Sequence, residues 1–409
     1  MQATAQFLQN YREYIRRHAG SLAIALGLGA AGASAAYYAY QSASNRLADS
    51  LGGPGSGNRR LGSETARQQQ RKDADENLAN HFVSVQTISD TTTLPQMLEE
   101  LERHLNRAAS LDALVLRLRQ LKGGDSEIEA TKHALWRELA EAGFARTASA
   151  IWLLPLLQLL LRVQLNILGR QLFMESNLLE PRGKPGAWRA QPMRLSPAEL
   201  IRVGKGAQEQ FLEYAHYLPE RSVQATVERH KLAAYAALEG LELTQPLSAE
   251  QVHEVLSEMA GEFEEAVRLS GGWVDLALPS AEDAARYFAS FRRAPPDNSA
   301  LVPGPQVAIT DEEIVRAMVE EVEQVMSRPL FCAALKASVD EVIRQVRELV
   351  QRELGDAQLP MAKVVPRVSL VADALLKPDG AIRQSVLTAI ASLPEVERLA
   401  ASVYSFGPQ

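Results

Sequence analysis

The chain lacks most of what enzymes and secreted domains depend on. It has one cysteine, Cys332, in 409 residues, so it can form neither an internal disulfide nor a metal site built from several cysteines. We expect Cys332 to be a small buried residue. There is no glycine-rich phosphate loop of the P-loop type, no His-Glu-x-x-His zinc motif and no serine in a nucleophile-elbow sequence. Nothing positive therefore indicates an enzyme, and the cysteine content suits a reducing compartment such as the cytosol.

The titratable residues that remain are predicted to be structural. The histidines are scattered, and His230 and His253, both on charged helices, are expected to be solvated or to lie at the edge of the core. Glu262, Glu264 and Glu265 are expected to form a charged helix face rather than a catalytic carboxylate pair. The sequence thus predicts no cofactor, no metal and no small-molecule substrate.

Positive charge is concentrated at the start of the chain. Residues 1–72 hold nine Lys and Arg against three Asp and Glu, a net charge of +6. Because the whole chain carries −7, the remainder carries −13. An acidic body of this kind makes nucleic acid an improbable partner.

An uncharged stretch near the N-terminus predicts a membrane anchor. Residues 18–45 carry no formal charge when His18 is neutral, and Ser21–Tyr40 supplies twenty mostly apolar residues, the length that spans a bilayer. A cleaved signal peptide is the competing interpretation, because Arg16 and Arg17 precede an apolar run that ends in small residues. A body with a single cysteine argues against secretion. Three arginines flank the span on either side, so charge does not decide its orientation.

The rest of the chain is predicted to be helical, because no stretch shows sustained alternation of apolar and polar residues. Capping boxes at Ser248 with Gln251 and at Thr310 with Glu313 mark helix starts. We expect an all-α fold: a single-pass N-terminal anchor followed by one large elongated helical bundle. The predicted parts are a short N-terminal segment (1–20), a transmembrane helix (21–40), a flexible polar and basic linker (41–78) and the bundle (79–409).

The most apolar helix of the predicted bundle lies within Ser126–Gly169. Thr147–Leu161 is fifteen residues without a charge and would rise about 22 Å as a helix, short of the roughly 30 Å of a bilayer core. We predict a buried core helix, with a second membrane span and an interfacial segment as the alternatives. Arg162, which follows this run, is expected to find a carboxylate or backbone carbonyls.

Four motifs in this order resemble the peroxin-3 family. They are NHF at 80–82, LLLRVQLNILG at 159–169, LPMAKVVP at 359–366 and ASVYSFGP at 401–408. Members of that family are peroxisomal membrane proteins that dock the soluble import receptor peroxin-19. The resemblance implies an N-terminus in the peroxisomal matrix and a body in the cytosol. It implies contact with peroxisomal or endoplasmic reticulum lipid, and whether insertion begins at the endoplasmic reticulum stays open.

The resemblance also implies a groove that captures the amphipathic N-terminal helix of a peroxin-19-like receptor. Trp136 would be its central anchor, and Lys132, Leu135 and Leu139 lie on adjacent ridges of the same predicted helix. The complete predicted set is Leu121, Lys122, Lys132, Leu135, Trp136, Leu139, Asn166 and Lys363. The alternative function is a helical tether for organelle inheritance or selective autophagy, which handles no cargo and needs no groove around Trp136.

Deleting residues 1–45 should release the protein from membranes, because the only predicted span lies there. The truncated chain is expected in the soluble fraction after alkaline carbonate extraction. Co-flotation of the truncated chain with vesicles would show instead that 147–161 or another segment inserts. Residues 1–45 fused to a fluorescent reporter are expected at peroxisomes.

Overall fold

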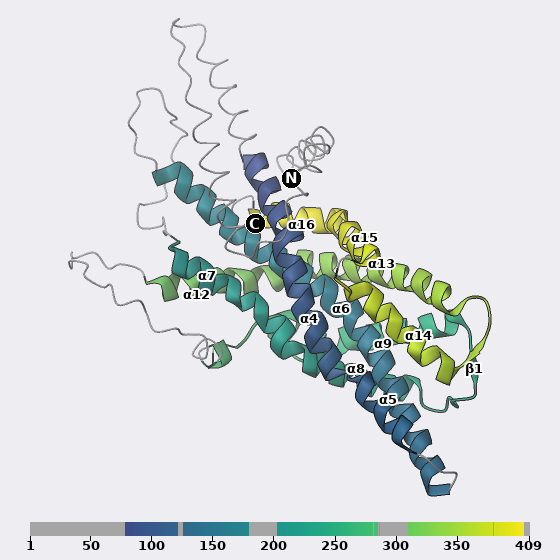
Figure 1. Cartoon of the computed structure of the whole chain (residues 1–409). Coiled ribbons are helices and arrows are strands. Elements are labelled where there is room, and N and C mark those ends of the chain that lie inside the picture. Colours follow the sequence, from purple (N-terminus) through teal and green to yellow (C-terminus); the bar gives the residue numbers. More distant parts are fainter. Residues whose placement is uncertain are drawn as a thin grey trace, which may run out of the picture. The chain divides into compact units, whose positions relative to one another are not determined.

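The computed structural model describes residues 78–121, 126–179, 203–280, 282–284, 286, 310–378 and 380–404, and most of them are helical (Figure 1). The predicted all-α class is therefore confirmed for this part of the chain. The expected anchor (21–40) and nearly all of the expected linker (41–78) lie outside the described residues.

Residues 78–88 form the first described helix. The elements that follow are η1 (Ser89–Thr93), α4 (Leu94–Ala108), α5 (Leu111–Gln120), α6 (Ser126–Leu179), α7 (Lys205–Glu213), η2 (Tyr214–His216), η3 (Leu218–Ser222), α8 (Val223–Ala237), β1 (Pro246–Leu247), α9 (Ala249–Leu269), α10 (Trp273–Ala277), α12 (Asp311–Met326), α13 (Pro329–Leu354), β2 (Leu359–Pro360), α14 (Met361–Leu376), α15 (Ala381–Ala391) and α16 (Pro394–Tyr404).

The predicted helix signals appear as structural caps. Ser248 with Gln251 and Thr310 with Glu313 each form a capping box, which satisfies two backbone N–H groups at the start of α9 and of α12. Helix α13 ends at Gly355, whose φ of 72° lies in the left-handed region that glycine adopts without strain.

The two short strands form an antiparallel pair in which Pro246 faces Pro360 and Leu247 faces Leu359. Each strand leads directly into a long helix, α9 or α14. The pair therefore holds the first turns of α9 and α14 at one place.

Contacts divide the chain into two compact units, whose boundaries fall within α4, within α6 and within α16 as well as between residues 204 and 205. The larger unit comprises Met97–Leu160 and Lys205–Leu399. In it, α13 packs against α9, α14 and α15, α8 packs against α9, and α7 packs against α12. The smaller unit contains 78–96, 161–179, 203–204 and 400–404 among its described residues.

Trp152 of α6 lies at the centre of the larger unit and is 2% exposed. Its indole N–H donates to the carbonyl of Ala260 at 3.0 Å, and its ring stacks on that of Trp273 with centroids 4.8 Å apart. Phe263 adds a tilted ring at 5.7 Å. This aromatic cluster ties α6 to α9 and α10.

Helix α6 is surrounded by protein. Among the described residues, it is the one helix long and apolar enough to cross a membrane, over Ser126–Glu175, and 94% of its most apolar window is buried. A helix that is apolar on every side is stable in water only when other elements cover it. The prediction of a core helix at Thr147–Leu161 is confirmed by this burial.

In the smaller unit, α6 packs against residues 78–88 and against α16. A Cβ added at Gly169 would lie 2.6 Å from Val85 Cγ2, so this approach requires glycine. Phe82 meets the ring of Tyr404 edge-on at 5.1 Å, and Arg170 donates to the carbonyl of Val403 at 2.8 Å. Residues 78–88, the C-terminal part of α6 and the end of α16, which are distant in the sequence, thus share one core.

The predicted placement of two side chains is wrong. His230 is fully buried rather than solvated or at the core edge, because α8 turns it onto Phe263, with ring centroids 4.4 Å apart, and toward Ser149 Oγ at 3.1 Å. Cys332 is exposed rather than buried, because Phe331 beside it takes the inward position in the first turn of α13.

His230 should make unfolding depend on pH. Burial lowers its pKa from 6.5 to about 3 in the folded chain, so only the unfolded chain takes up a proton at this site between those values. Above pH 6.5 this histidine therefore does not lower the free energy of unfolding. As the pH falls from 6.5 toward 3, it lowers the free energy of unfolding by up to about 1.4 kcal/mol per pH unit.

Urea unfolding of the chain lacking residues 1–45 at pH 7.5, 6 and 5 would measure this slope. His230→Leu is expected to flatten it, whereas His133→Leu on the exposed face of α6 should leave it unchanged. Equal slopes for wild type and His230→Leu would contradict the assignment.

Candidate functional site

The N-terminal half of α6 presents two adjacent rows of side chains. Leu135 and Leu139 are buried, each 4% exposed, and face the core. Ile128, Lys132 and Trp136 follow one another at four-residue spacing in the neighbouring row, and all three are half-buried. Trp136 therefore lies where the core face of the helix meets solvent, as the sequence predicts.

The two tryptophans of α6 have different environments. Trp152 is enclosed and its indole nitrogen is hydrogen-bonded within the core. Trp136 lies four turns earlier and is only half-buried. An amphipathic ring at a boundary is the kind of side chain that protein interfaces favour.

Helix α5 lies beside this part of α6. Arg117 approaches Glu138 to 3.9 Å, an exposed ion pair that contributes little stability but records the proximity. Leu121, directly after α5, is half-buried, and Leu116 is 57% exposed. Lys122, predicted as a site residue, lies outside the described residues.

Helix α14 packs directly on α6. A Cβ added at Gly143 would lie 3.3 Å from Val365 Cγ1, so a larger residue there would press the two helices apart. Further along, the Thr147 hydroxyl donates to the carbonyl of Val368 at 3.0 Å. From Gly143 to Thr147 toward the C-terminus of α6, the contacted residue moves from Val365 to Val368 toward the C-terminus of α14. The two helices therefore run in the same direction where they touch.

Lys363 lies in the first turn of α14, two residues before Val365, and is exposed. Trp136 lies about two turns before Gly143 on α6. Because the contacts of α6 with α14 advance in the same sense, the turn that carries Lys363 lies toward the Trp136 end of the contact. The structure thus brings α5, α6 and the start of α14 together in the larger unit.

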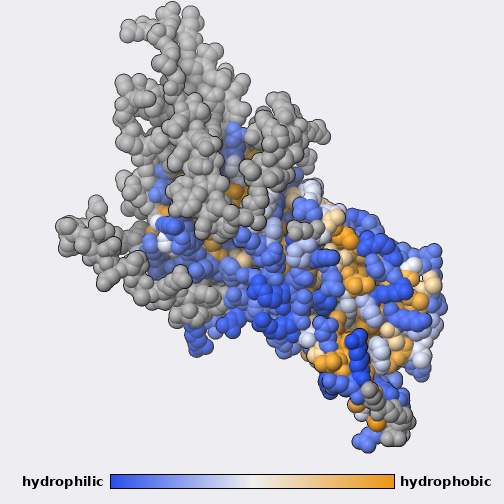
Figure 2. All heavy atoms as spheres, in the orientation of Figure 1, coloured by the Kyte–Doolittle hydropathy of each residue, from blue (hydrophilic) through white to orange (hydrophobic). Residues whose placement is uncertain are grey.

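Apolar surface accompanies these elements. Figure 2 shows it over α14 and α15 and where α5 meets α6. Leu370 of α14 is 51% exposed, and with Leu116 it is an apolar residue that the predicted site did not include. Both belong to leucine- and valine-rich helices in which apolar residues outnumber the buried positions. The sequence alone shows this excess of apolar residues, but it does not show which of them stay exposed.

The charges at this site are paired or solvated. Lys132 forms an ion pair with Glu129 at 2.7 Å, one turn earlier on α6. Burial raises the pKa of the Glu141 carboxyl, which lies beyond Trp136 on the same helix. The described site therefore offers apolar contact bordered by lysines, without convergent groups for acid–base chemistry.

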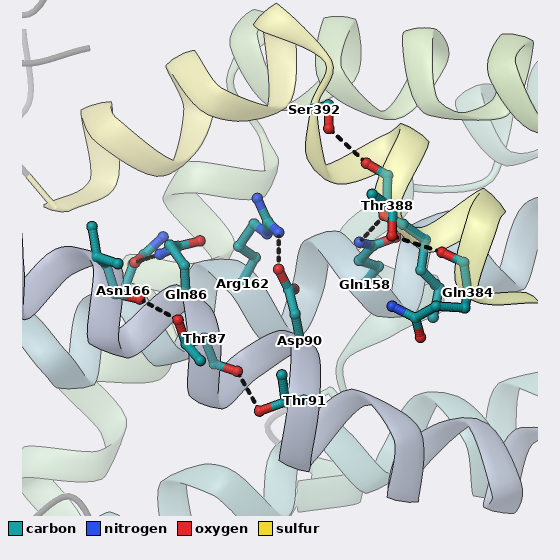
Figure 3. A network of polar contacts seen from close by, with 12 residues as sticks. Gln86, Thr87, Asp90, Thr91, Gln158, Arg162, Asn166, Gln384, Thr388 and Ser392 are labelled. Carbon is teal, nitrogen blue, oxygen red and sulfur yellow. Dashed lines mark hydrogen bonds and ion pairs between the residues drawn. The ribbon is translucent and has the colours of Figure 1, made fainter. Parts of the chain in front are cut away.

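Asn166, the remaining predicted site residue, belongs to the smaller unit. It is fully buried, and Gln86 donates a hydrogen bond to its side-chain oxygen at 2.5 Å (Figure 3). A side chain with no exposed surface positions its neighbours rather than meeting a partner. We therefore treat Asn166 as a structural residue.

Arg162 has a carboxylate partner, which is one of the two kinds of partner that the sequence predicts. Its guanidinium donates to Asp90 Oδ2 at 2.7 Å (Figure 3). The arginine side chain is 4% exposed and the aspartate side chain 34% exposed. This ion pair joins η1 to α6 in the smaller unit.

Comparison with known proteins relates the chain to one family. The profile of the peroxin-3 family matches residues 123–406, which include every candidate site residue except Leu121 and Lys122. The chain is 25% identical over 348 residues to peroxisome biogenesis protein 3-2 of Arabidopsis thaliana, covering 80% of this chain and 83% of that protein. It is 24% identical over 335 residues to peroxisomal biogenesis factor 3 of Homo sapiens, covering 76% and 80%.

Asp90→Ala should destabilise the protein, because it leaves the buried Arg162 guanidinium without its charge partner. Breaking a fully buried pair costs about 3–5 kcal/mol, and we expect about 2–3 kcal/mol here because Asp90 is partly solvated. Urea unfolding measures the change, and Asp112→Ala on the exposed face of α5 is the control. Equal stability of the two variants would contradict this role.

Proposed function

Because this chain belongs to the peroxin-3 family of peroxisome biogenesis factors, we propose that it docks a cargo-loaded, peroxin-19-like receptor at the peroxisomal membrane. The receptor would present an amphipathic N-terminal helix, and the larger unit would bind it between α5, α6 and the first turn of α14. The family is non-enzymatic, and docking requires neither a cofactor nor a small-molecule substrate.

The observation that carries the proposal is the half-buried position of Trp136 beside the buried residues Leu135 and Leu139. A partner helix that covers the accessible part of the indole would complete the burial of a large ring already held on one side. Such rigid, partly desolvated aromatics are the usual hot spots of protein interfaces. A residue needed only for the core would be enclosed, as Trp152 is.

The shape of the site favours a helix as the partner. The row formed by Ile128, Lys132 and Trp136 rises one turn at a time along α6, which is the spacing at which a second helix inserts its own apolar row. Leu116 of α5 and Leu370 of α14 add exposed apolar surface on neighbouring elements. An apolar stripe of about three turns on the receptor helix would match them.

The lysines have a secondary role in the proposal. Lys132 is already paired with Glu129 and Lys363 is exposed, so both remain partly hydrated at the rim. Rim charges act mainly on the rate of association and its salt dependence. Acidic residues that flank the apolar stripe of the receptor helix would be attracted to these two lysines.

Trp136→Ala should abolish most of the affinity while the protein stays folded. Truncating a central interface aromatic costs at least about 2 kcal/mol, roughly 30-fold in the dissociation constant. Calorimetric titration of a receptor N-terminal helix into the chain lacking residues 1–45 measures the affinity, and thermal melts of the same variants report folding. Trp152→Ala, by contrast, should lose about 3–5 kcal/mol of stability because it opens a core cavity.

Leu269→Ala is the matched control for loss of exposed apolar surface. Leu269 is 72% exposed at the end of α9. The first turn of α9 lies beside the start of α14, because β1 and β2 pair there. Leu269 is about 30 Å from that turn along the helix. It should bind the helix like wild type. Asn166→Ala should lower the melting temperature and leave the affinity unchanged. Unchanged affinity of a folded Trp136→Ala variant would contradict docking at this site and favour the tether.

A further inference from the structure

Two helical segments of the larger unit bring together an imidazole and two carboxylates. Glu100 lies on α4, His216 ends η2, and Glu220 lies in η3. One ligand-type atom from each of the three side chains lies within 4.8 Å of the other two. His216 Nδ1 and Glu100 Oε2 are 2.8 Å apart and share a proton. All three side chains are half-buried, which limits their mobility without closing them to solvent.

The sequence spacing on both segments suits a cation site. Glu100 and His104 are four residues apart on α4, and His216 and Glu220 are four residues apart on the facing segment. On the α-helix α4 this spacing places Glu100 and His104 on the same side. The chain between α7 and α8 passes through a 3₁₀ turn and a π turn, so His216 and Glu220 stand on irregular backbone of the type that often accompanies functional sites.

A surface cavity adjoins the cluster. It has a volume of about 400 Å³, and His104 and Glu220 both line it, with Arg107, Ala108, Arg221, Val223 and Gln224. Burial lowers the pKa of His104, so its imidazole is neutral and able to accept a metal near pH 7. The cavity gives a hydrated ion a path to the three ligand atoms and room for a water molecule on it.

We propose that Glu100, His216 and Glu220 bind a zinc ion. Imidazole nitrogen with carboxylate oxygen is a ligand set that Zn²⁺ accepts, and three protein ligands leave a fourth position for water or His104. Two carboxylates and a neutral imidazole would balance the charge of the ion. Small rotations of the side chains bring atoms within 4.8 Å of one another to the separations that metal bonds of about 2.0–2.2 Å require. The ion would clamp α4 to the segment between α7 and α8.

Metal and proton compete for the same site. In the absence of metal, His216 Nδ1 and Glu100 Oε2 already hold a proton between them across 2.8 Å. Binding replaces the shared proton with the metal and releases that proton to solvent, so affinity should fall as the pH drops. Arg103 and His104 act on the Glu100 carboxyl, Glu213 acts on the His216 imidazole, and Arg107 and Arg221 line the adjoining cavity.

Isothermal titration of Zn²⁺ into the full-length chain in detergent micelles tests the proposal. We expect saturable binding of one ion per chain with release of a proton, and a rise in melting temperature with zinc. The absorption spectrum of added Co²⁺ should report low coordination number with nitrogen and oxygen ligands. His216→Asn keeps a hydrogen-bonding group near the position of Nδ1 and should weaken zinc binding at least about 10-fold, as should Glu220→Gln.

His133→Asn provides the control, because His133 is exposed on α6 and lies outside the cluster. It should bind zinc like wild type. Equal weakening by His133→Asn and His216→Asn, or binding that does not saturate at one ion, would show adventitious binding by surface histidines and overturn the proposal. Unchanged zinc affinity in folded His216→Asn and Glu220→Gln variants would overturn it as well.

Discussion

The structure depends on covering one helix. Helix α6 runs for 54 residues and is apolar on every side over its central turns, so it is stable only when other elements surround it. In the larger unit the aromatic cluster around Trp152 and the contact at Gly143 serve this purpose. In the smaller unit Gly169 allows the close approach of residues 78–88. Both cores are built on the same helix.

The candidate site lies where this covering is incomplete. Toward its N-terminus α6 changes from apolar on every side to amphipathic, and Trp136 occupies the boundary. The same physical constraint therefore accounts for an enclosed tryptophan at 152 and a partly accessible one at 136. A partner helix from another molecule would cover this end of α6, as α9, α10 and α14 cover its central turns within the chain.

Sequence reasoning succeeds where the signal is local. The capping boxes of α9 and α12 and the presence of a partner for Arg162 follow from spacing or from the cost of burying a charge. It fails where the outcome depends on which helices face one another. Nothing within α8 indicates that His230 stacks on Phe263, and 116 residues separate His216 from Glu100. The half-buried position of Trp136 at the edge of the core was predictable, whereas the neighbours that frame it were not.

The central claim is that Trp136 is the contact residue for a partner helix. The most direct measurement is ¹⁹F NMR of the protein labelled with 5-fluorotryptophan, with resonances assigned by single Trp→Phe substitutions, during titration with a receptor N-terminal helix. The account predicts that the Trp136 resonance shifts and loses its sensitivity to solvent isotope, because its ring becomes buried, while the Trp152 resonance stays in place. A helix that binds without moving the Trp136 resonance would contradict the account.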